Sequence, residues 1–113
     1  MATIEQVALA QRLYDVGLAP KGVTLQNYMD GPVFWWGETR KWEPWRSWDA
    51  VAHLIEKYSM GIYQHEQWEI TAIGAHGDGL RLFRAKAENF SGVPAAVARL
   101  ALQLHDRATE IVP

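Results

Sequence analysis

The chain has 113 residues, with 49% hydrophobic and 21% charged side chains, which is the size and composition of one globular domain and excludes a disordered, charge-rich chain. Its formal charge of -2 at pH 7 lacks the positive field that binders of duplex nucleic acid need. The absence of cysteine excludes disulfides and thiolate zinc sites and is typical of a reducing compartment.

The first third of the chain predicts a helix followed by a strand pair. Thr3 and Gln6 have the spacing of a capping box, and Gly17 suits the left-handed residue that ends many helices. Residues 23–29 alternate between two faces, and residues 33–36 follow an Asp-Gly-Pro turn. Such alternation across a turn indicates two antiparallel strands.

The middle of the chain repeats this succession. Ser47 is a good N-cap residue and Asp49 lies in the first turn of a helix whose apolar spacing continues to Gly61. From residue 62 the apolar period returns to two. We expect a hairpin here, with the turn at the His-Gly-Asp-Gly sequence of residues 76–79.

The last helix begins near Pro94, because a proline is tolerated in a first helical turn. It carries the cleanest apolar stripe of the chain, formed by Val97, Leu100, Ala101, Leu104, Ala108 and Ile111. Amphipathic helices and one-faced strands are best buried against each other. We therefore predict a single α+β domain over residues 1–113, with a four-stranded antiparallel sheet packed with three helices in the order αββαββα.

A group of features in the C-terminal half recurs in one known family. They are the aromatic entry Pro44 and Trp45, the helix start Ser47 and Asp49, the strand residue Trp68, the strand end Ala85 and Ala87, and the alanine-rich stretch 94–102. In these features residues 44–104 resemble the small phage and prophage proteins of the ABA-sandwich type. The resemblance implies a phage accessory protein that inhibits or modulates host machinery, including defence systems such as CRISPR.

Motifs for catalysis, metal binding or cofactor binding are not found in the sequence. No histidine forms a metal-binding pair at positions i and i+4. The nucleophile motif Gly-x-Ser-x-Gly is missing, and the glycines of residues 76–79 lack the spacing and the lysine of a phosphate loop. We expect no catalytic residue, no metal and no cofactor, and hence a protein that is not an enzyme.

Tryptophan is the outlying residue type. Five of the six tryptophans lie between Trp35 and Trp48, and tryptophan and arginine dominate the energetics of protein interfaces. Trp35 and Trp36 cannot both face the core if they lie on one strand. The expected partner-binding residues are Trp36, Arg40, Trp42, Trp45 and Arg46. The alternative is that the cluster forms a satellite core under a long loop.

The expected function is binding and modulation of a host protein or protein complex, with self-association left open. Replacing Trp42 or Trp45 by alanine should then weaken binding and leave the melting temperature nearly unchanged. The alternative function is a small-ligand or single-stranded nucleic-acid module that uses indole platforms. A second surface to test is the basic row Arg81, Arg84 and Lys86, which usually protects a strand edge.

A cytoplasmic location is expected. The N-terminus lacks the basic and apolar regions of a signal peptide, and the apolar runs are too short to span a bilayer. We therefore expect no membrane partner.

Overall fold

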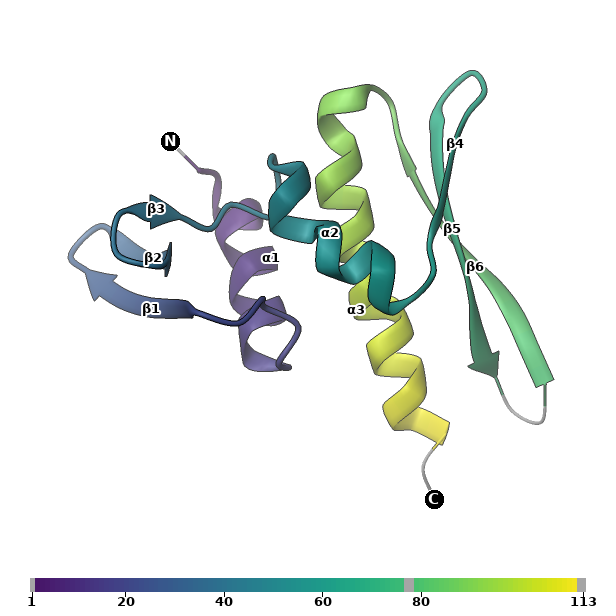
Figure 1. The fold of residues 1–113 in the computed structure, drawn as a ribbon, viewed down its shortest axis with the longest axis horizontal. Coiled ribbons are helices and arrows are strands. Elements are labelled where there is room, and N and C mark those ends of the chain that lie inside the picture. Colours follow the sequence, from purple (N-terminus) through teal and green to yellow (C-terminus); the bar gives the residue numbers. More distant parts are fainter. Residues whose placement is uncertain (1, 77–78, 112–113) are drawn as a thin grey trace.

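The computed structural model describes residues 2–76 and 79–111, which form two antiparallel sheets with helices between them (Figure 1). One sheet contains β1 (Val23–Tyr28), β2 (Gly31–Trp36) and β3 (Arg40–Lys41), and the other contains β4 (Gly61–Gln64), β5 (Trp68–His76) and β6 (Gly79–Ala87). The helices are α1 (Ile4–Asp15), α2 (Trp48–Lys57) and α3 (Val93–Ile111), the last preceded by a short 3-10 turn, η1 (Phe90–Gly92).

The α+β class with three helices is confirmed, but the single four-stranded sheet and the order αββαββα are wrong. β3 is only two residues long, too short to show an alternating pattern. β4 and β5 were expected to be one strand. They are separated by a turn in which the N–H of His65 donates to the carbonyl of Gln67 at 3.0 Å, and this turn contains neither glycine nor proline to announce it.

The ends of α1 follow the sequence prediction. The Thr3 hydroxyl accepts from the N–H of Gln6 at 3.1 Å, and the Gln6 side chain accepts from the N–H of Thr3 at 2.9 Å, which confirms the capping box. Gly17 has φ 80°, and the N–H of Leu18 donates to the carbonyl of Leu13 at 2.8 Å. This bond closes the helix in a Schellman motif, which needs a left-handed residue at the position of Gly17.

The second helix is shorter than predicted and ends without a glycine. It stops at Lys57, and Ser59 takes the left-handed conformation with φ 50°. The N–H of Met60 then donates to the carbonyl of Ile55 at 2.9 Å, so a serine occupies the position where the sequence rule looks for glycine. Apolar spacing continues to Gly61, but the backbone leaves the helix before it.

The core lies where the helices meet the inner face of the β4–β6 sheet. Val97, Leu100 and Ala101 are fully buried and Leu104 is nearly so, which confirms this part of the predicted stripe, while the side chains of Ala108 and Ile111 lie outside the described set. A methyl group on Gly74 would lie 2.7 Å from the Leu104 side chain. Glycine in β5 therefore lets α3 approach the sheet closely.

Strand pairing sets which side chains face α3. Ile70 and Ala72 of β5 and Phe83 and Ala87 of β6 are buried on the inner face. The pairing ends with His76 opposite Gly79. The predicted turn between them falls on Gly77 and Asp78, outside the described residues.

Candidate functional site

The structure places the tryptophans of residues 35–48 in different environments. Trp36 points to the core side of β2 together with buried Phe34, and Trp35 points to the opposite face, as alternation requires. Trp45 and Trp48 are half-buried, whereas Trp42 is only 1% exposed. The cluster is therefore neither one exposed patch nor one buried group.

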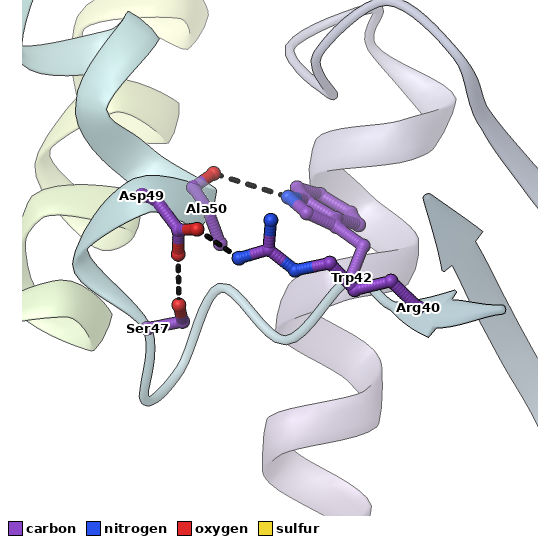
Figure 2. A network of polar contacts seen from close by, with 5 residues as sticks. All are labelled: Arg40, Trp42, Ser47, Asp49 and Ala50. Carbon is purple, nitrogen blue, oxygen red and sulfur yellow. Dashed lines mark hydrogen bonds and ion pairs between the residues drawn. The ribbon is translucent and has the colours of Figure 1, made fainter. Parts of the chain in front are cut away.

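Trp42 is a core residue that holds the loop between β3 and α2 in place. Its indole Nε1–H donates to the carbonyl of Ala50 at 3.0 Å (Figure 2), and its ring meets the ring of Phe34 edge-on, with centroids 5.9 Å apart. A side chain this enclosed cannot be a surface anchor without rearrangement. The sequence-based expectation that Trp42→Ala leaves the melting temperature nearly unchanged therefore does not fit the structure, because loss of an enclosed indole should destabilise the fold strongly.

Arg40 links the first sheet to the start of α2. Its guanidinium lies over the Trp36 ring, 4.9 Å from the centroid, and donates to the carboxylate of Asp49 (Figure 2). The other oxygen of Asp49 accepts from the hydroxyl of Ser47. Ser47 does occupy the N-cap position of α2, but its hydroxyl is used in this way and makes no capping bond to the helix.

Trp45 and Arg46 lie in the same loop and border a hollow of about 820 Å³. The loop is closed by a bond of 3.1 Å from the N–H of Ser47 to the carbonyl of Glu43, and Pro44 within it is buried. The hollow is lined by α1, β2 and this loop, with the charged residues Asp30, Lys41, Glu43 and Arg46 among its walls. Arg46 is exposed and Trp45 half-buried.

Four of the five predicted binding residues thus keep an accessible part. We call them the Trp–Arg surface: Trp36, Arg40, Trp45 and Arg46. Asp49 links the part formed by Trp36 and Arg40 to the part formed by Trp45 and Arg46. Its carboxylate accepts from Arg40 and from Ser47, the residue after Arg46. The fifth residue, Trp42, supports the surface from below.

Sequence reasoning missed a second accessible apolar group, on the outer face of the β4–β6 sheet. Ile73, Leu80 and Leu82 are 66%, 78% and 46% exposed. Strand alternation through the basic row could have revealed them, because Leu80 and Leu82 share a face with Arg84. The row itself is divided: Arg81 lies on the other face, with its guanidinium 5.8 Å from the Phe83 ring centroid.

Two titratable side chains away from this surface, His53 and Tyr58, are partly buried. The Nε2 atom of His53 lies 2.7 Å from the carbonyl oxygen of Leu18, which joins α2 to the segment after α1. Burial raises the pKa of the Tyr58 phenol above its ordinary value of 10.0, so this side chain is neutral at physiological pH.

The described residues contain neither a cluster of metal-ligating side chains nor a helix that could span a membrane. No three His, Asp or Glu side chains in residues 2–76 and 79–111 are grouped so that they could hold a metal ion. In the same part of the chain no helix has the length and apolarity to cross a bilayer.

Comparison with known proteins gave no relative. No protein-family model matches the chain, and no significant match was found among curated proteins or solved structures.

Proposed function

We propose that this protein is a non-enzymatic binding module that docks on another protein through the Trp–Arg surface. Phage origin, action in the host cytoplasm, and inhibition or modulation of a host complex such as a CRISPR defence system belong to the same proposal. These parts rest on the resemblance of residues 44–104 to the phage ABA-sandwich proteins.

One observation carries the proposal: accessible indole and guanidinium groups are held by hydrogen bonds and ring contacts within the chain. Buried Trp42 is bonded to α2 at 3.0 Å, and Arg40 is held between Trp36 and Asp49. Tryptophan and arginine are the residue types most enriched among interface hot spots. Holding them in place before binding reduces the conformational entropy lost on association.

The alternative function, a site for a small ligand or single-stranded nucleic acid, has one observation in its favour. The hollow beside Trp45 has a volume of about 820 Å³, within the range of small-molecule sites. However, its wall carries Asp30 and Glu43 as well as Lys41 and Arg46, so the cations are balanced by carboxylates. The phosphate backbone of a single-stranded nucleic acid needs a groove with net positive charge. The mixed charge of this hollow therefore favours a protein partner.

We expect Trp45→Ala to weaken binding of the partner by roughly 30-fold to 1000-fold, the loss typical of a central interface anchor. The measurement begins with affinity capture from nuclease-treated bacterial lysate on the immobilised protein. The captured protein is then purified, and its affinity for the wild type and for Trp45→Ala is determined by calorimetry.

A matched control is Tyr63→Ala, which removes another accessible ring, 54% exposed, outside the Trp–Arg surface. This variant should bind normally. Equal affinity of wild type and Trp45→Ala would contradict the proposed surface. If the protein captures a partner from untreated lysate but not from nuclease-treated lysate, and if the affinity falls steeply with salt, these results would instead support nucleic-acid binding.

A further inference from the structure

The outer edge of β6 carries backbone groups that face away from the sheet. In the strand order β4-β5-β6, β6 pairs on one side only within the described chain. The carbonyl of Lys86 accepts a bond from the Arg99 guanidinium at 3.5 Å, so it points away from β5. Because backbone direction alternates along an antiparallel strand, Leu80, Leu82 and Arg84 also turn their N–H and carbonyl groups to this edge.

The side chains of the same residues lie on the sheet face that no helix covers. α3 packs on the opposite face (Figure 1). Leu82 pairs directly with Ile73 across the strands, and together with Leu80 they form an exposed apolar group at 46%, 66% and 78% exposure. Arg84 and Lys86 continue the same face toward the end of β6. The edge is thus apolar in its first half and cationic in its second.

Charge decides which occupant fits this edge. β6 contains Arg81, Arg84 and Lys86 and no acidic residue. Glu69 of β5, which lies opposite Lys86 in the register, forms an ion pair with Arg84 at 3.7 Å, so the two outer-face cations face one carboxylate. A second copy of β6 would set Arg84 and Lys86 opposite the same cations if parallel, or opposite Leu82 and Leu80 if antiparallel about Phe83. In neither arrangement would the strand pair offer these cations a carboxylate. An acidic strand from a different protein would have complementary charge.

We infer that β6 accepts an extended segment of a partner protein by strand addition, in which main-chain bonds give affinity and alternate side chains give specificity. In the antiparallel direction the segment begins opposite Lys86, whose carbonyl keeps its bond from Arg99. Its main chain pairs with Arg84, Leu82 and Leu80, where the segment ends. Its pattern from the N-terminus is therefore acidic-x-acidic-x-apolar-x-apolar. The inference rests on the proposed protein-binding function, but it uses a surface separate from the Trp–Arg surface, so each can fail alone.

Short peptides test this inference without knowledge of the partner. The probe is the blocked peptide Asp-Thr-Asp-Thr-Val-Thr-Val, and its control has lysine in place of both aspartates. We expect the acidic peptide to bind saturably and to protect the amides of Leu80, Leu82 and Arg84 from hydrogen exchange. The double variant Arg84→Glu, Lys86→Glu should bind it at least about tenfold more weakly and should prefer the lysine peptide.

A second peptide pair distinguishes strand addition from simple charge attraction. N-methylation of the alternate peptide amides that face β6 should abolish binding, whereas methylation of the other amides should leave it intact. Trp45→Ala should bind the acidic peptide like the wild type, which separates this site from the Trp–Arg surface. If the acidic peptide does not bind, or if the lysine peptide or the form methylated at the amides that face β6 binds equally well, the inference is overturned and the cations of β6 only protect an edge.

Discussion

Trp42→Ala is expected to lower the free energy of unfolding by about 3–5 kcal/mol, the range for deleting a large enclosed aromatic side chain. The indole is 1% exposed, and its removal leaves a cavity between β2 and α2. It also deletes the bond from Nε1 to the Ala50 carbonyl. Since small domains have a total stability of roughly 5–15 kcal/mol, denaturant unfolding followed by circular dichroism should show a large fall in the midpoint.

Trp42→Phe separates the two contributions. Phenylalanine keeps most of the ring volume but cannot donate the bond to Ala50, so its cost should be clearly smaller than that of alanine. If Trp42→Ala costs less than about 1 kcal/mol, the indole is not enclosed as described. It would then return to the set of candidate surface anchors.

Leu100→Ala should cost about 2–5 kcal/mol, because its side chain is fully buried at the contact between α3 and the sheet. Most of this energy is lost apolar burial, and the rest comes from the cavity that the neighbouring side chains cannot fill. The same denaturant titration gives this loss of unfolding free energy. An unchanged slope of the unfolding free energy against denaturant concentration would show that the folded and unfolded states keep their compactness.

Leu80→Ala is the matched control for this substitution. It removes the same atoms from a leucine that is 78% exposed, so its effect on stability should stay within about 0.5 kcal/mol. Similar losses for the two variants would show that α3 is not packed on the sheet as described.

The sequence predicted those elements whose signals are local. The capping box of Thr3, the left-handed Gly17 and the stripe of the last helix depend on neighbouring residues alone. The first two were found, and the stripe was found as far as Leu104. Ile4, however, is 89% exposed although it continues the apolar spacing of its helix. Apolar spacing alone does not show which part of a helix extends beyond the surface against which it packs.

The division into two sheets could not be predicted in the same way. β3 pairs with β2 through only two residues, and its position depends on Trp42 being drawn into the core rather than on its own propensity. The break between β4 and β5 occurs at polar residues that are equally compatible with one continuous strand. Both features are decided by tertiary packing.

For the candidate site, composition predicted the region but not the orientation of each side chain. Trp42 and Trp45 lie three residues apart and both line the hollow, yet Trp42 is buried and Trp45 is half-buried. Along a loop without a regular period, nothing in the chain assigns each residue to one side. The exposed leucines of β6 are interleaved with basic residues, so the sequence pattern there indicates a charged row more readily than an apolar face.

Site-specific photocrosslinking tests most directly the claim that the Trp–Arg surface meets another protein. A photoreactive phenylalanine derivative is placed at Lys41, an exposed position that lines the hollow beside Trp45, and, as the control, at Gln103, an exposed position on α3. After irradiation in nuclease-treated bacterial lysate, we predict one dominant protein adduct for the probe at Lys41 and none for the probe at Gln103. No adduct at Lys41 from a probe-bearing protein that melts like the wild type, or the same adducts at both positions, would contradict the proposed surface.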